Sequence, residues 1–156
     1  MYAIAIGYPL GIRDDKYIVE YNKEISITFQ ETAVWMSFNG IKQIHDLNED
    51  KNYFNNLVSL GIVVNAQSLT ELGKKLRNIV PVRQGAGSAE NGIPAIFIGD
   101  KTIKPIPLHY SIWKLCSGNR NVLKIYKSIQ KEYKISYEEF IKNLSCLDEL
   151  DLVFLT

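Results

Sequence analysis

Two stretches of the chain decide the fold: YIVEYNKEISITFQETAVWMSFNG at residues 17–40 and AIFIGDKTIKPIPLHYSIWKLCSG at residues 95–118. They align without a gap at an offset of 78 residues and share five identical residues. Each contains two short apolar segments around a polar turn, then a helical segment with Trp35 or Trp113, then Gly five residues after the Trp. This pattern predicts a duplicated unit that opens with a β-hairpin.

The order of elements after each glycine also repeats. Apolar residues at helical spacing predict a second helix over 41–47 in the first copy and over 122–129 in the second. A third helix then ends at Gly61 or Asp151, where the apolar pattern changes to that of a strand. Capping-box patterns mark three helix starts, at Thr28-x-x-Glu31, Ser68-x-x-Glu71 and Ser136-x-x-Glu139. The expected fold class is α+β, with a hairpin, three helices and a strand in each unit.

The domain organisation follows from the repeat. We expect a first unit over 1–82, a glycine-rich linker with the sequence RQGAGSAENG over 83–92, and a second unit over 93–156. The opening MYAIAIGYPLGI is predicted to be a first strand, because it lacks the basic region and small-residue cleavage site of a signal peptide.

Composition limits the classes of partner. The 156 residues include 18 basic and 17 acidic ones, so a net charge of +1 provides no chain-wide field for nucleic acid or an anionic membrane. Any DNA-binding surface must therefore be local. No apolar run approaches the ~20 residues that span a bilayer. Cys116 and Cys146 have no CxxC spacing, which is typical of a reduced compartment, and we expect a cytoplasmic protein.

Candidate catalytic and cofactor residues do not form a convincing set. His45 and His109 lack a Cys or paired carboxylates at metal-ligand spacing. His109 and Cys116 share a predicted helix face but lie about 10 Å apart, too far for proton transfer. The glycines of 85–87 precede a predicted strand, whereas a dinucleotide loop opens a helix. We therefore expect a non-enzymatic protein without metal, cofactor or small-molecule substrate.

The segment LGIVVNAQSLTELGKKLR at 60–77 resembles the end of bacterial winged-helix regulators. In that family a third helix closes on a Leu-Gly-apolar-apolar step, and a later helix begins with a motif matched here by Leu69, Thr70, Gly73 and Leu76. The resemblance implies tandem winged-helix units and transcriptional regulation through DNA. Only about five residues separate the strand at 62–64 from the next helix, too few for a two-stranded wing.

The third helix of the first copy supplies the candidate DNA-binding residues. Its polar face consists of Asn52, Asn55, Asn56 and Ser59. Asn can bridge the N6 and N7 atoms of adenine in the major groove, and nearby cations can contact phosphates. The candidate cations are Lys51, Lys74, Lys75, Arg77 and Arg83. A solvated helix face in a chain rich in Asn and Lys is an equally good interpretation of this pattern.

A second resemblance suggests a different partner. The hairpin before the helices, with Ile112-Trp113-x-x-x-x-Gly118 and the following Asn121-Val122, is similar to PqqD-like elements that hold precursor peptides for modifying enzymes. The resemblance implies that a peptide adds as a strand to the hairpin edge and packs against the third helix. The candidate peptide-binding residues are Ile18, Val19, Glu20, Ile96, Phe97 and Ile98. Peptide or protein recognition is therefore the alternative function.

The second copy lacks an Asn-rich face on its third helix. The equivalent positions are Lys142, Ser145, Cys146 and Glu149. Nearby carboxylates at 138, 139 and 148 would repel phosphate. We expect this copy to bind protein or to form a homodimer, with a purely structural role as the alternative, and only the first copy to bind DNA.

Overall fold

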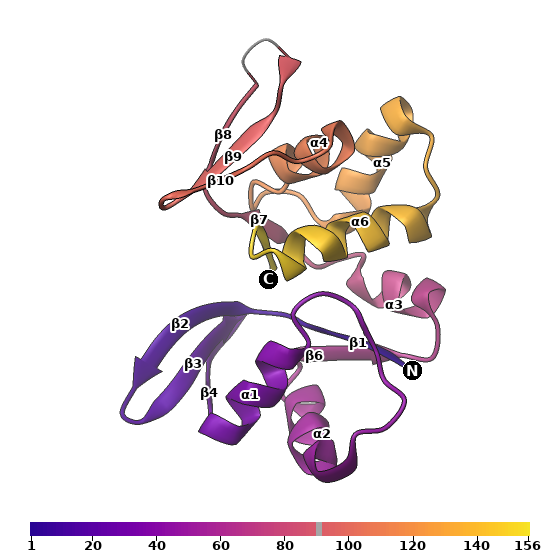
Figure 1. Ribbon diagram of the computed structural model, residues 1–156. Coiled ribbons are helices and arrows are strands. Elements are labelled where there is room, and N and C mark those ends of the chain that lie inside the picture. Colours follow the sequence, from indigo (N-terminus) through magenta and orange to yellow (C-terminus); the bar gives the residue numbers. More distant parts are fainter. Residues whose placement is uncertain (90–91) are drawn as a thin grey trace. The chain divides into compact units, whose positions relative to one another are not determined.

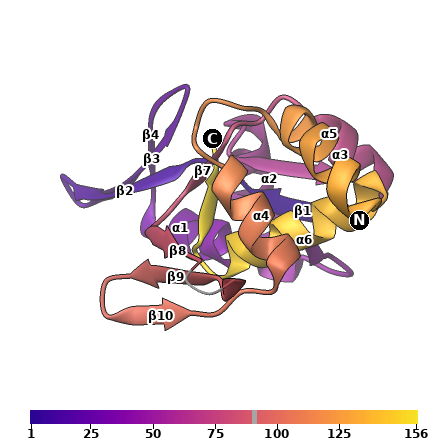
Figure 2. The same cartoon turned by 90° about the horizontal axis from the view of Figure 1, so that it is seen from above.

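The computed structural model describes residues 1–89 and 92–156, and it shows a mixed α+β protein (Figures 1 and 2). The chain divides into two compact units. The first comprises Met1–Leu76 with Leu155–Thr156, and the second comprises Arg77–Phe154. This division differs from the expected boundaries at 82 and 93, because the residues after Arg77 form strands of the second unit.

A three-stranded antiparallel sheet organises the first unit. Strand β1 (Tyr2–Ala5) lies between β5 (Lys42–Gln43) and β6 (Val63–Ala66). Helix α3 (Leu69–Leu76) packs against β1 and β6. The expected strand after the third helix is confirmed as β6, and it pairs with β1. No wing hairpin follows in residues 1–89.

The expected hairpin of the first copy is part of a second three-stranded sheet. Strand β3 (Lys16–Tyr21) pairs with both β2 (Tyr8–Arg13) and β4 (Lys23–Ile27), and the turn residue Asn22 has φ 58°. The single strand expected at the start of the chain is instead β1 and β2, separated at Gly7. Gly7 has φ 114°, and a Cβ there would lie 2.4 Å from Val19 Cγ1. Only glycine therefore fits at this break between β1 and β2.

Helices α1 (Phe29–Ser37) and α2 (Lys51–Ser59) enclose the core of the first unit. The α1 capping box of Thr28 and Glu31 is confirmed. The core combines Val34, Trp35 and Phe38 of this region with Phe54 and Leu57 of α2, and with buried residues of β1, β3, β4 and β6. The indole N–H of Trp35 donates to the carbonyl oxygens of Ile6 and Ile62 at 3.3 and 3.2 Å.

The helix expected over 41–47 is wrong. This segment contains β5 and leads into a short 3₁₀ helix at Asn48–Asp50. Gln43 pairs with Tyr2, and the Ile44 N–H donates to the Met1 carbonyl at 2.8 Å. Pairing with β1 therefore satisfies backbone groups that a helix would have satisfied internally.

The second unit opens with an antiparallel sheet in which β9 (Ala95–Ile98) lies between β8 (Ala86–Ser88) and β10 (Lys101–Ile103). The flexible linker expected over 83–92 is wrong for its described part, which holds β8 and the end of β7 (Pro81–Arg83). Glu90 and Asn91 lie outside the described residues. Gly87 in this segment allows the backbone to lie against Trp113, because a Cβ at this position would lie 2.4 Å from Trp113 Cζ3.

The three helices and closing strand expected in the second copy are confirmed. They are α4 (Pro107–Leu115), α5 (Val122–Tyr133), α6 (Tyr137–Glu149) and β11 (Val153–Leu155), which pairs with β7. The Asn121 side chain caps α5, and the predicted capping box of Ser136 and Glu139 starts α6. Asp151 has φ 56° between α6 and β11, as expected from its position. Among the described residues, every helix is too short or too polar to cross a bilayer.

Candidate functional site

The predicted DNA-binding face of α2 is exposed, but half of it is already engaged. Asn56 Nδ2 donates to Glu31 Oε1, and the Ser59 hydroxyl donates to the Asn56 carbonyl at 2.7 Å. Asn52 and Asn55 make no side-chain hydrogen bond within the described part of the chain. Two amides therefore remain available to a ligand.

The partner of Asn56 is a charged group that the fold uses. Glu31 is 8% exposed and accepts hydrogen bonds from the Thr28 N–H and hydroxyl at 2.8 and 2.9 Å. Burial raises the pKa of the Glu31 carboxyl, but the hydrogen bonds from Thr28 and Asn56 outweigh burial and leave this pKa below its usual value. Asn56 therefore stabilises the start of α1, a role that competes with binding a base.

The predicted cations of the first unit do not gather beside α2. Directly paired residues share a face of a sheet, so Ala3, Ala5 and Val63 face the core that contains α2. Helix α3 packs against β1 and β6 on the other side of this sheet from α1 and α2 (Figure 1). Lys51 starts α2, whereas Lys74 and Lys75 belong to α3. The sheet therefore separates Lys51 from the two α3 lysines.

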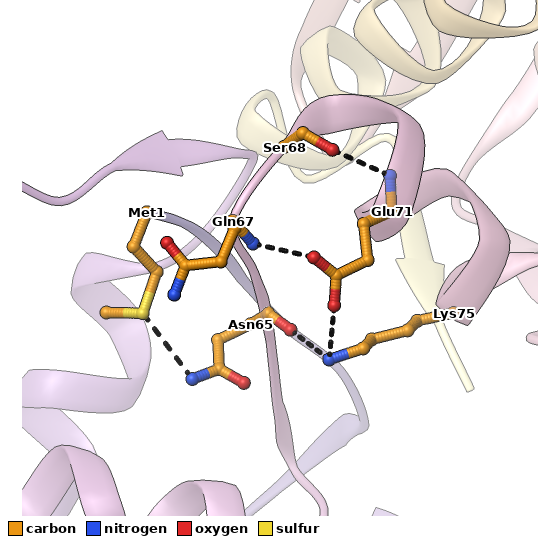
Figure 3. Close-up of polar contacts among 6 residues, drawn as sticks. All are labelled: Met1, Asn65, Gln67, Ser68, Glu71 and Lys75. Atoms are coloured by element: carbon orange, nitrogen blue, oxygen red, sulfur yellow. Dashed lines mark hydrogen bonds and ion pairs between the residues drawn. The ribbon is translucent and has the colours of Figure 1, made fainter.

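Lys75 also takes part in a local network at the start of α3 (Figure 3). Its Nζ donates to the Asn65 carbonyl at 2.7 Å and lies 3.3 Å from Glu71 Oε1. The Gln67 N–H donates to Glu71 Oε2 at 3.0 Å, and this bond, followed by Lys75, lowers the pKa of the Glu71 carboxyl. The Ser68 hydroxyl accepts a hydrogen bond from the Glu71 N–H, as the capping box predicts. The second bond of the box differs, because the Glu71 carboxylate accepts from the N–H of Gln67 and not from that of Ser68.

The two predicted arginine contacts belong to the second unit. Arg77 is exposed. Arg83 Cζ lies 4.8 Å from the centroid of the Trp113 ring, and Arg83 Nη1 donates to the Lys114 carbonyl at 3.2 Å. The cation–π contact and the hydrogen bond hold the Arg83 side chain against α4. Of the predicted DNA-binding set, the structure therefore brings together only Lys51, Asn52 and Asn55 as available groups.

The predicted peptide-binding residues do not lie at a sheet edge. Ile18, Val19 and Glu20 belong to β3, and Ile96, Phe97 and Ile98 belong to β9. Both strands are central, so each has a partner strand on both sides. An added strand would have to use β2, β4, β8 or β10 instead, and the assignment of the edge to β3 and β9 is wrong.

Among these edges, β4 is the longest regular one. It pairs with β3 through five consecutive residues and contains no proline. The β2 edge contains Pro9, which lacks an N–H, and the register with β3 shifts between Pro9 and Gly11. Strand β10 has only three residues, and Pro105 follows closely. The β4 edge is therefore the best template for a further strand.

Helix α1 begins directly after β4 and presents an apolar surface to solvent. Phe29 is 81% exposed and Met36 is 56% exposed. Ala33, also exposed, lies between them at i, i+4 and i+7 spacing, which places the three on one side of the helix. The only charged residue of α1 is the buried Glu31. We call Phe29, Ala33 and Met36 the α1 apolar face. This face was not predicted from the sequence, although its i, i+4, i+7 spacing is visible there.

A shallow hollow of about 480 Å³ lies beside β5, with Phe38, Ile44 and Leu47 among its lining residues. His45 and Asp46 also line it, and Asp46 Oδ1 accepts the Asn48 N–H at 3.0 Å. No group of three or more His, Cys, Asp or Glu residues suited to a metal occurs in residues 1–89 and 92–156. The hollow therefore lacks the features of a metal centre.

The other titratable candidates are structural. His109 Nε2 lies 2.8 Å from Asn143 Oδ1 and links α4 to α6. Cys116 is buried, and burial raises the pKa of its thiol to about 12, partly offset by Arg83. A thiol with this pKa is protonated near neutral pH and is a poor nucleophile.

Comparison of the chain with protein-family models, with curated proteins and with solved structures finds no match to any of them.

Proposed function

We propose that the protein is a non-enzymatic recognition module that binds an extended segment of another protein along the β4 edge and the α1 apolar face. One observation carries the proposal: an open, proline-free edge leads through the single residue Thr28 into a helix whose exposed side is uncharged and carries the α1 apolar face.

The two parts of this site have complementary roles. An edge of five residues is about 17 Å long and offers backbone N–H and C=O groups to an added strand, which supplies affinity without sequence preference. Phe29 comes two residues after Ile27, the last residue of β4, so it lies at one end of this edge. Apolar side chains of the bound segment contact Phe29 and Met36 and supply the sequence preference.

Sequence-specific DNA binding through α2 is the second candidate. Its support is the pair of exposed amides of Asn52 and Asn55, which have no side-chain partner in the described residues and lie beside Lys51. The engagement of Asn56 removes one of its predicted base contacts, and the separation of the α3 lysines by the sheet leaves Lys51 as the cation beside Asn52 and Asn55.

The proposal is tested with a phage-displayed library of random dodecapeptides selected on the full chain. We expect selected peptides to bind with an affinity that changes little between about 50 and 200 mM salt, because backbone pairing is not counter-ion driven. Amide hydrogen exchange of the complex should show slower exchange at alternate residues of β4, since alternate N–H groups of an edge strand point outward.

The matched variants separate the apolar face from the rest of α1. Phe29→Glu combined with Met36→Glu should abolish selection of the peptides, whereas Gln30→Glu combined with Ser37→Glu adds the same charge to α1 and should preserve it. Peptides that bind both variants equally, or that protect no β4 amide, would overturn the proposal. Binding of a mixed-sequence duplex that is lost in Asn52→Ala/Asn55→Ala would support the second candidate.

A further inference from the structure

Helix α5 of the second unit carries three lysines in a row along its solvent side. Lys124, Lys127 and Lys131 follow the i, i+3, i+7 spacing and are all exposed. At 100° per residue they fall within about 60° of one another, opposite the buried Val122 and Ile129. Their Cα atoms span about 10 Å along the helix axis. We call these residues the α5 lysine row.

The surroundings of the α5 lysine row are strongly basic. Residues 120–134 contain five basic residues and one acidic residue, a net charge of +4, whereas the whole chain has a net charge of +1. Arg120 and Lys134 flank α5 in the sequence, and both are exposed. The one carboxylate, Glu132, lies at least 80° around the helix from each lysine of the row. The positive charge is therefore local and one-sided.

The fold gains little from this arrangement, since only Lys131, in the last turn, is favoured by the helix dipole. None of the three lysines forms an ion pair within residues 1–89 and 92–156. Like charges three or four residues apart on a helix repel each other, which applies to both successive pairs of the row. Lys124 lies in the first turn, where the positive end of the helix dipole also disfavours a cation. A bound polyanion would relieve all of these repulsions.

The spacing of the three lysines indicates which kind of anion the row binds. Three point charges spread over about 10 Å suit a series of phosphates better than one small anion. An anionic membrane fits less well, because membrane-binding helices insert apolar residues and α5 exposes no large apolar side chain. We infer that the α5 lysine row binds the phosphate backbone of a nucleic-acid duplex.

A site made of lysines is expected to bind a duplex without preference for its base sequence. Lysine contacts phosphate as a point charge, and base recognition instead depends on bidentate groups such as Arg, Asn or Gln in a groove. Carboxylates limit the site at one end, because Glu138 and Glu139 are exposed in the first turn of α6, shortly after Lys134. The Glu139 carboxylate is held by the Ser136 N–H at 2.8 Å. The site therefore extends from Arg120 to Lys131.

The test is fluorescence anisotropy of a labelled 20-base-pair mixed-sequence duplex with the full chain. For three phosphate contacts the logarithm of affinity should fall with the logarithm of salt concentration with a slope of about −2.7, or about 40-fold from 50 to 200 mM. Lys124→Gln/Lys127→Gln/Lys131→Gln should weaken binding at least tenfold at 50 mM salt and flatten this slope. Circular dichroism of the variant checks that its helix content is unchanged.

A matched variant controls for net charge. Lys16→Gln/Lys101→Gln/Lys104→Gln removes the same charge from exposed lysines elsewhere and should leave duplex affinity within about twofold. Equal loss in both triple variants would overturn the inference, as would absence of binding to the duplex at 50 mM salt. Vesicles with 30% phosphatidylserine should not bind, and row-dependent binding to vesicles but not to duplex would identify a membrane as the ligand instead. Loss of duplex binding only in Asn52→Ala/Asn55→Ala would place the site on α2 and also overturn it.

Discussion

At the residue scale, Gly87 shows how a single missing Cβ permits a contact. The backbone of β8 lies against the Trp113 ring, and a Cβ on Gly87 would lie 2.4 Å from Cζ3 and 2.7 Å from Cη2 of this ring. We expect Gly87→Ala to lower the free energy of unfolding by about 1–3 kcal/mol, because buried Trp113 must shift to accommodate the methyl group.

Urea denaturation measures this change, and Ala86→Ser on the same strand provides the control. Ala86 is exposed, so its substitution should alter the free energy of unfolding by less than about 0.5 kcal/mol. Equal stability of the Gly87→Ala variant and the unaltered protein would contradict the close contact between β8 and Trp113.

The Glu31 carboxylate leads to a pH-dependent prediction. Its pKa in the folded state is below its ordinary value, so it contributes stability that is present above the ordinary value and is lost as pH falls through the lowered one. We expect Glu31→Gln to lower the free energy of unfolding by about 1–2 kcal/mol at pH 7, because charged hydrogen bonds to Thr28 and Asn56 become neutral ones.

Denaturation at pH 7 and at pH 3 tests this prediction. The difference between Glu31→Gln and the unaltered protein should shrink at the lower pH, where the carboxyl of the unaltered protein becomes protonated. A difference that stays constant with pH would show that the loss arises from packing rather than from charge.

Local chemistry explains which residues could be predicted from the sequence. The capping residues Thr28 and Ser136 were identified correctly because a cap depends on neighbours three residues away. The engagement of Asn56 by Glu31 could not be predicted, since these residues are 25 positions apart and meet only after α1 and α2 pack. Arg83 was predicted to bind phosphate for a similar reason. Its contact with Trp113 forms only in the folded chain and is not visible in the sequence.

At the element scale, α5 allows a test of repulsion that needs no ligand. Removing the charges of the α5 lysine row eliminates two like-charged pairs, Lys124 with Lys127 and Lys127 with Lys131. Each such pair destabilises a helix by about 0.2–0.5 kcal/mol, and Gln has nearly the same helix propensity as Lys. The triple Gln variant should therefore be more stable than the unaltered protein by a few tenths to about 1 kcal/mol at low salt.

Thermal denaturation at two salt concentrations measures this gain. It should diminish at 1 M salt, where the Debye length of about 3 Å screens the repulsion. A gain that persists at high salt would mean that the lysines strain α5 for a reason other than charge.

Hairpins between neighbouring segments could be predicted from the sequence, but pairing between segments outside the repeated stretches could not. The hairpins β3–β4 and β9–β10 were predicted because their turns and apolar alternation are local. Their third strands, β2 and β8, contain glycine and lie outside the repeated stretches, so the central position of β3 and β9 was not recognised. The segment 41–47 was misassigned because three apolar residues at helical spacing do not reveal pairing with β1.

At the scale of the whole molecule, the two units share a framework and differ in surface chemistry. In each, a three-stranded antiparallel sheet precedes a helix with a buried Trp whose indole N–H donates to a backbone carbonyl. The first unit then offers an uncharged helix face beside an open strand edge, while the second offers a lysine row. The sequence predicts that the copies differ on their third helices, and the exposed surfaces of α1 and α5 add a further difference between the units.

The last strand has a consequence for how the protein is made. Val153 and Phe154 of β11 belong to the second unit, whereas Leu155 belongs to the first and accepts the Gly7 N–H at 2.6 Å. The second unit is thus inserted into the first. A ribosome reaches Leu155 only after it has synthesised the entire second unit. The amide of Gly7 therefore gains this partner only after the second unit has been synthesised, so the first unit is completed later than the second.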